Sequence, residues 1–124
     1  LHIEDATVFT GFQSDAAPYI SRAEALVLAS KYEGFGLVLV EAMVLGRPVV
    51  ASDCPSGPAE VLDGGRAGIL VPVGDVDALA SALSQLAADP AMRERLAAVS
   101  AERAKAFDIH ESVTQLLELC RPSR

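Results

Sequence analysis

The chain has 124 residues, of which 51% are hydrophobic and 22% are charged, and its formal net charge is −7. This balance is typical of one globular domain and excludes a disordered or fibrous chain. No run of Lys and Arg is present, so a nucleic-acid partner, which requires clustered cations, is not expected. The longest apolar runs fall far short of the roughly 18 residues that span a membrane. We expect a cytoplasmic protein, with peripheral attachment to the inner face of the membrane as the alternative.

The two cysteines, Cys54 and Cys120, lie far apart and lack the spacing of a zinc site, so we expect free thiols in a reducing compartment. The chain begins at Leu1, at the approach to an expected strand, and we therefore expect residues 1–124 to be part of a longer protein.

The first part of the chain alternates between short apolar runs and helical patterns. Apolar, partly β-branched runs predict buried strands at residues 6–10, 25–29, 49–51 and 68–71. Helices are predicted between them, at residues 14–23, 36–45 and 59–62. Such alternation predicts an α/β fold, a Rossmann-like parallel sheet of about four strands flanked by helices. This core would span residues 6–72.

The remaining chain has only helical patterns. Asp75 and Asp89, the latter followed by Pro90, are typical helix caps, and Asp108 with Glu111 forms a variant capping box before a final helix. We therefore expect a helical tail over residues 75–120.

The segment Glu33-Gly-Phe-Gly-Leu37 is the strongest candidate site. It directly follows a predicted parallel strand, and open α/β sheets place their ligands at the carboxyl ends of strands. Gly34 and Gly36 let the backbone turn and come close to a ligand, while the amides of Phe35, Gly36 and Leu37 are helix-start donors suited to phosphate or sugar oxygens.

Two carboxylates flank these donors. Glu33 precedes the expected helix and Glu41 lies in its second turn, so both can point toward one cleft and accept hydroxyl groups of ribose or a hexose. The alternative is that Glu33 caps the helix and Glu41 is a solvated surface residue. Spacing alone does not separate the two interpretations.

Glu33 and Glu41, with seven residues between them and followed by Ala-Met-Val-Leu-Gly-Arg-Pro-Val-Val, resemble the E-x7-E signature of retaining glycosyltransferases of family 4, which share the GT-B fold. Val-Phe-Thr-Gly at residues 8–11, Gly-Pro-Ala-Glu at 57–60 and Gly-Ile-Leu-Val at 68–71 also resemble motifs of that family and occur in its order. The similarity extends across most of the chain and indicates a carboxyl-terminal donor-binding domain.

The resemblance implies roles for these residues. Glu33, the candidate catalytic residue, would hydrogen-bond the donor sugar, the amides from Gly34 to Leu37 would lie near sugar and diphosphate, and Glu41 would hold the ribose. Gly11, Ser52 and Asp53 are candidates for the pocket lining, although Asp53 in a local turn is an equal alternative. Such enzymes need no metal or other cofactor in the donor site, and the leaving diphosphate of a UDP- or GDP-linked sugar helps to deprotonate the acceptor.

Full members of the family have further segments that these residues lack. Two more strand–helix units would bring a glycine-rich loop and an Arg/Lys pair to the diphosphate, and an amino-terminal domain would bind the acceptor. We therefore expect the isolated chain to be inactive. Without the intervening strands, we expect either direct pairing of the strands around Val8 and Val27 or a dimer that pairs exposed sheet edges.

The resemblance therefore implies transfer of a sugar from a nucleoside-diphosphate sugar to a glycan, lipid or other acceptor, in bacterial polysaccharide or glycoconjugate biosynthesis. One alternative is a non-catalytic remnant that binds a nucleotide or a partner chain. A sugar-nucleotide epimerase of the same fold is a minor alternative, because no His/Asp pair occupies a site position.

Overall fold

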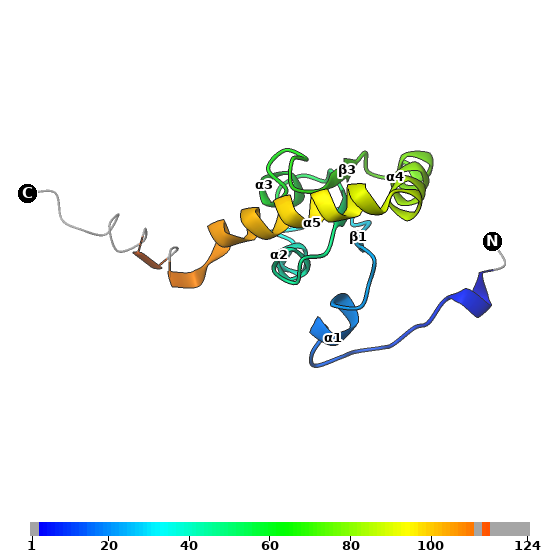
Figure 1. The fold of residues 1–124 in the computed structure, drawn as a ribbon, viewed down its shortest axis with the longest axis horizontal. Helices are drawn as coiled ribbons and strands as arrows, with labels where there is room; N and C mark the ends of the chain where they lie inside the picture. The colour runs from blue at the N-terminus through cyan, green and yellow to red at the C-terminus, as the bar shows by residue number, and fades with distance from the viewer. Residues whose placement is uncertain (1–2, 111–112, 115–124) are drawn as a thin grey trace, which may run out of the picture.

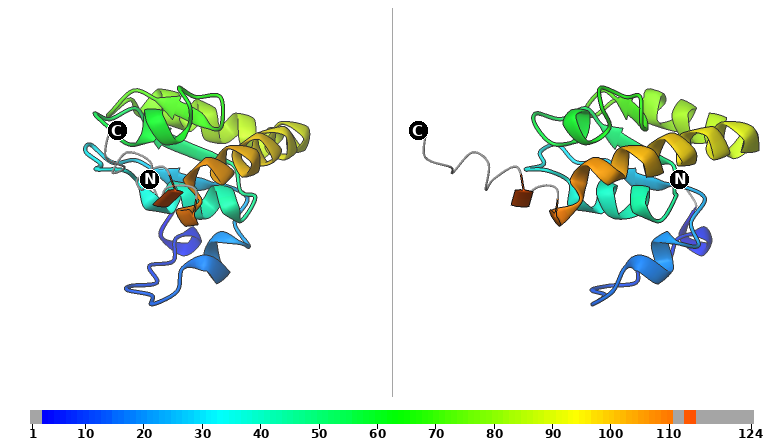
Figure 2. Two further views of the ribbon diagram at one scale, coloured as in Figure 1. Left: turned by 90° about the vertical axis from the view of Figure 1, so that its left-hand side faces the viewer. Right: turned by 60° about the vertical axis from the view of Figure 1, so that its left-hand side comes forward.

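The computed structural model describes residues 3–110 and 113–114. Their centre is a parallel sheet of the strands β1 (Leu26–Leu28), β2 (Val49–Ser52) and β3 (Ile69–Val71), in that order. Val27 pairs with Val50, and Ala51 with Leu70. Helices follow each strand and cover the sheet on both faces (Figures 1 and 2). The predicted α/β class with a parallel, helix-flanked sheet is confirmed.

The alternation of side chains along β2 divides the core into two clusters. Val49 and Ala51 pack with α2 (Leu37–Val44) and α3 (Pro58–Val61) on one face. Val50, between them in sequence, packs with α4 (Val76–Ala88) on the other. All four residues of β2 are buried, as expected for a central parallel strand.

The helical tail begins as the sequence predicts. Asp75 Oδ1 accepts a hydrogen bond from the amide of Ala78 at 2.8 Å, which caps α4. Asp89 Oδ1 accepts one from the amide of Met92 at 2.9 Å, which caps α5 (Pro90–Ala104). Both carboxylates satisfy amides that the first turn of a helix leaves without acceptors.

Helix α5 continues into a single 3-10 turn, η2 (Lys105–Phe107). Figure 1 shows α5 running across the layered body, from the end of α4 past α2 and α3. The buried hydroxyl of Ser100 donates to the carbonyl oxygen of Ala67 at 2.6 Å and so fixes α5 to the turn before β3. Helix α5 therefore packs on the same face of the sheet as α2.

The strand predicted at residues 6–10 is wrong. A 3-10 turn, η1 (Glu4–Ala6), occupies its start, and the segment then runs outside the layered body to the short helix α1 (Ala17–Ile20), as Figure 1 shows. Val8 is 83% exposed and Phe9 is 94% exposed. A strand needs a neighbour for its backbone hydrogen bonds, and β1 pairs only with β2 among the described residues. The sheet therefore has three strands here instead of about four.

Direct pairing of the segments around Val8 and Val27 is accordingly wrong as well. A dimer through exposed edges involves a second chain and stays a prediction. The helix predicted after Asp108 lies largely outside the described residues, as does Cys120, whereas Cys54 is a buried free thiol. Within residues 3–110 and 113–114, no helix has the length and apolar character needed to cross a bilayer.

Candidate functional site

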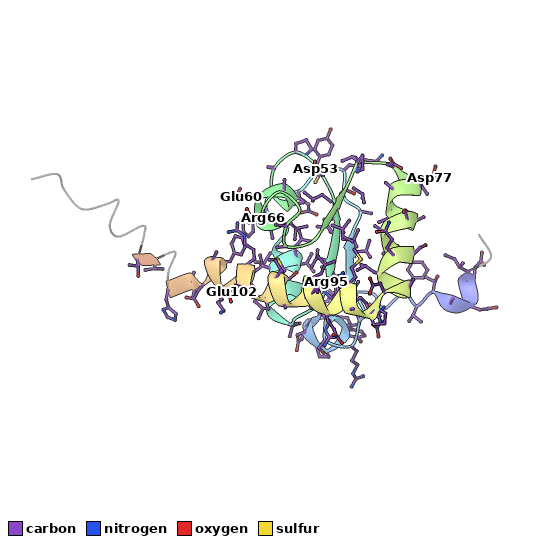
Figure 3. All side chains as sticks on the ribbon, turned by 45° about the horizontal axis from the view of Figure 1, so that its top comes forward. Asp53, Glu60, Arg66, Asp77, Arg95 and Glu102 are labelled. Atoms are coloured by element: carbon purple, nitrogen blue, oxygen red, sulfur yellow. The ribbon has the colours of Figure 1, made fainter. Side chains whose placement is uncertain are left out.

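Two loops leave the same edge of the sheet, because β1 and β2 are parallel neighbours. Residues 29–36 connect β1 to α2, and residues 53–57 connect β2 to α3. The amide of Asp53 donates to the carbonyl oxygen of Val71 at 2.8 Å, which continues the ladder one residue beyond β2. Figure 3 shows Asp53 at this end of the sheet. The candidate site is therefore at the carboxyl ends of the strands, as expected.

Glu33 is held by two side chains. Ser30 Oγ donates to Glu33 Oε1 at 2.7 Å, and Ser56 Oγ lies 2.9 Å from the carbonyl oxygen of Glu33. The interpretation of Glu33 as a helix cap is wrong, since Gly36 is the N-cap residue and no side chain caps α2. The half-buried carboxylate of Glu33 instead has a fixed position beside the loop and keeps a second oxygen for a ligand.

The start of α2 presents backbone donors. The amides of Phe35, Gly36 and Leu37 have no hydrogen-bond acceptor among the described residues. Gly36 has φ +80°, and an added Cβ would lie 3.0 Å from Leu39 Cδ1, so this position requires glycine. An added Cβ at Gly34 would meet nothing within 4 Å, and Gly34 has no positive φ. Gly34 therefore leaves the backbone open to a ligand, and no sharp turn requires a glycine there.

Glu41 lies on the exposed side of α2 and faces α1. It lines an open hollow of about 420 Å³ together with residues before and in α1, among them Gln13, Asp15 and Ile20. A carboxylate that binds ribose hydroxyls must be exposed in this way. An ordinary surface residue is exposed as well. The geometry of Glu41 alone leaves both interpretations open.

The three candidate lining residues have different positions. Ser52 is the buried last residue of β2, and Asp53 is the exposed residue after it, so both lie at the edge that carries Glu33. Gly11 belongs to the exposed segment before α1, which runs outside the layered body (Figure 1). Ser52 and Asp53 therefore lie at the same edge of the sheet as the loop of Glu33, whereas Gly11 belongs to the segment before α1.

Several residues that contact this loop could not be predicted from the sequence. Besides Ser30 and Ser56, they include Gly57, where an added Cβ would lie only 2.8 Å from the carbonyl oxygen of Phe35. Phe107 of η2 also contacts the ring of Phe35. The glycine before Pro58 could have indicated a position with no space for a side chain. No local sequence pattern connects Phe107 with a loop so distant in sequence.

Comparisons with known proteins agree with the fold. The family described as glycosyl transferases group 1 matches residues 1–89. The lipopolysaccharide core biosynthesis glycosyltransferase LpsD of Rhizobium meliloti is 34% identical over 114 residues, which cover 92% of this chain and 33% of the relative. The phosphatidyl-myo-inositol mannosyltransferase of Mycobacterium leprae is 45% identical over 87 residues, which cover 70% of this chain and 23% of the relative.

A crystal structure of Anabaena HepE in complex with UDP has a TM-score of 0.88 and 28% identity, and the match covers 94% of this chain and 32% of HepE. Sucrose-phosphate synthase from Thermosynechococcus elongatus has a TM-score of 0.75 and 39% identity, with 84% of this chain and 26% of the synthase covered. Both of these similar structures are GT-B glycosyltransferases. The chain spans only about a quarter to a third of the length of these proteins. It belongs to the family of group 1 glycosyl transferases.

Proposed function

We propose that the chain forms part of the donor-binding lobe of a retaining glycosyltransferase that uses a nucleoside-diphosphate sugar. The observation that carries this proposal is the start of α2, where the amides of Phe35, Gly36 and Leu37 lack acceptors among the described residues and lie beside the fixed carboxylate of Glu33. Backbone donors at a helix start attract a diphosphate through both hydrogen bonds and the helix dipole.

In this proposal Glu33 orients hydroxyls of the donor sugar, and the loop amides bind sugar and diphosphate oxygens. Glu41 would hold the ribose, and Ser52 and Asp53 would line the pocket. These residues supply positioning and electrostatic stabilisation and no nucleophile, which suits a retaining transfer in which the leaving diphosphate takes the acceptor proton. We further propose that the donor binds without a metal ion.

The relatives support an acceptor in bacterial glycoconjugate biosynthesis. The names of two of them refer to the lipopolysaccharide core and to phosphatidyl-myo-inositol, both glycoconjugates or their precursors. The solved HepE complex contains UDP, which favours a UDP-linked sugar over a GDP-linked sugar as the donor. Transfer to a polysaccharide or lipid-linked acceptor is therefore the activity that we propose for the whole protein.

Calorimetric titration of the full-length protein with UDP, GDP and their sugars tests the proposal. We expect one nucleotide series to bind, with an unchanged Kd in EDTA. Hydrogen bonds to charged groups contribute about 1.5 to 3 kcal/mol, so Glu41→Gln should weaken binding by about tenfold or more. The matched control Glu94→Gln, on the exposed side of α5, should bind like the wild type.

The possible outcomes separate the alternatives. A folded protein that binds none of these nucleotides would support the non-catalytic interpretation and contradict a donor site. Binding and sugar transfer that remain unchanged in Glu41→Gln would remove Glu41 from the site and leave it a surface residue.

A further inference from the structure

Phe35, the central residue of the candidate donor loop, has an aromatic partner from the far end of the described chain. Its ring centroid lies 5.5 Å from that of Phe107, and the two ring planes are inclined by 76°. This edge-to-face arrangement is favourable because the positive edge of one ring meets the negative face of the other. The contact connects η2 directly to the loop between β1 and α2.

Phe107 is itself held by Arg103. The guanidinium carbon of Arg103 lies 4.8 Å from the centroid of the Phe107 ring, within the range of a cation–π interaction. Nε of Arg103 donates to the carbonyl oxygen of Val61 at 3.2 Å, and a terminal nitrogen donates to that of Glu60 at 2.9 Å. Because two hydrogen bonds fix the planar guanidinium, its face has a defined orientation toward Phe107.

The two carbonyls belong to the end of α3, which follows the loop of Ser56 and Gly57. Figure 3 shows α5, where Glu102 is labelled, beside α3, where Glu60 is labelled. The contacts thus run from α3 through Arg103 and Phe107 to Phe35. They support the donor loop with groups that lie outside the loop itself.

We infer that Phe107, oriented by Arg103, is a positioning residue for the donor site and acts through Phe35. The inference rests on the proposed function. Fixing the ring of Phe35 restricts the backbone of its own residue and of Gly36, whose amides are the expected diphosphate donors. A donor group held in place before binding loses less conformational freedom when the ligand arrives, so removal of the ring contact should weaken nucleotide binding.

A purely structural role is the competing explanation, because Phe107 also packs against the main hydrophobic cluster. The test therefore compares affinity with stability in the full-length protein. Phe107→Leu keeps an apolar side chain of similar reach and removes the ring. From the usual strength of an aromatic pair, we expect the Kd of the bound nucleotide to rise by about three- to tenfold.

Three further variants make this comparison specific. Phe107→Tyr keeps the ring and should bind within about twofold of the wild type, while Arg103→Lys, which cannot donate to both carbonyls in the same geometry, should raise the Kd. Leu96→Ala removes a side chain that packs against the other core cluster, around Val50 and Leu86. It should lower the Tm without changing the Kd.

A double-mutant cycle tests the route through Phe35. In a Phe35→Leu background, Phe107→Leu should change the Kd by less than about twofold, since the ring contact is already lost. Equal effects of Phe107→Leu in both backgrounds would overturn the inference. So would a Kd within twofold of wild type in both Phe107→Leu and Arg103→Lys, accompanied by a lower Tm. A wild-type protein that binds no nucleotide would instead contradict the proposed function itself.

Discussion

The hydroxyl of Ser56 lies 2.9 Å from the carbonyl oxygen of Glu33, so the loop after β2 is joined to the loop after β1. Its single proton is shared with the carbonyl oxygen of Pro55, 2.6 Å away. Ser56 also has φ +61°, a conformation that serine adopts rarely, which indicates that the surrounding loop imposes it. The two loops of the candidate site therefore form one unit.

Ser56→Ala should weaken donor binding more than it weakens the fold. An exposed hydrogen bond contributes about 0.5 to 1.5 kcal/mol, and its loss would free the backbone of Glu33. We expect a twofold or greater rise in the Kd measured by calorimetry. Ser21→Ala, which removes a comparable exposed bond to the carbonyl oxygen of Pro18, is the control and should leave the Kd unchanged. Equal affinities in the two variants would contradict the coupling.

Gly57→Ala should displace the loop of Glu33. The new Cβ would lie 2.8 Å from the carbonyl oxygen of Phe35, in addition to the cost of a side chain at φ +75°. Gly74→Ala is a matched control, because Gly74 has φ +79° and open space around it. In both variants the side chain at positive φ should lower the free energy of unfolding in urea by about 1 to 2 kcal/mol. Only Gly57→Ala should lower it further and also weaken nucleotide binding. Equal losses would show that the contact with Phe35 is easily relieved.

Gly34→Ala should separate binding from stability. The position has no positive φ and no neighbour within 4 Å of an added Cβ, so the Tm should not fall. A methyl group on the uncovered backbone would stand where we expect the ligand, and the Kd should rise. Unchanged affinity for every nucleotide that binds the wild type would place the ligand away from Gly34.

Ser100→Ala should destabilise the fold by about 1 to 3 kcal/mol, because it leaves the carbonyl oxygen of Ala67 buried without its donor. Ser81→Ala, on the exposed side of α4, should stay within about 0.5 kcal/mol of wild type. Urea unfolding measures both. A loss as small as that of Ser81→Ala would mean that water replaces the hydroxyl and that packing alone attaches α5 to the turn before β3.

The layered core was predictable because its signals are local. The apolar run around Val27 and the caps Asp75 and Asp89 each act within a few residues, and the structure confirms the elements that they predict. The position of Glu33 at a strand's carboxyl end was predictable for the same reason.

The run around Val8 had the composition of a strand but no partner among the described residues, and composition alone cannot supply one. The contacts of Ser56, Arg103 and Phe107 depend on how separate elements pack, so no spacing in the sequence indicates them. The most informative parts of the candidate site are therefore those that only the three-dimensional arrangement reveals.

The pairing of β1 with β2 has a consequence for how such a site can diverge. Parallel neighbours keep the starts of the two loops about 4.8 Å apart, whatever side chains the loops carry. Substitutions at positions such as Tyr32 or Pro55 can alter which groups meet a ligand while the two loops still start from the same places. The ladder fixes where the two loops start, and ligand preference is left free to evolve in the loops.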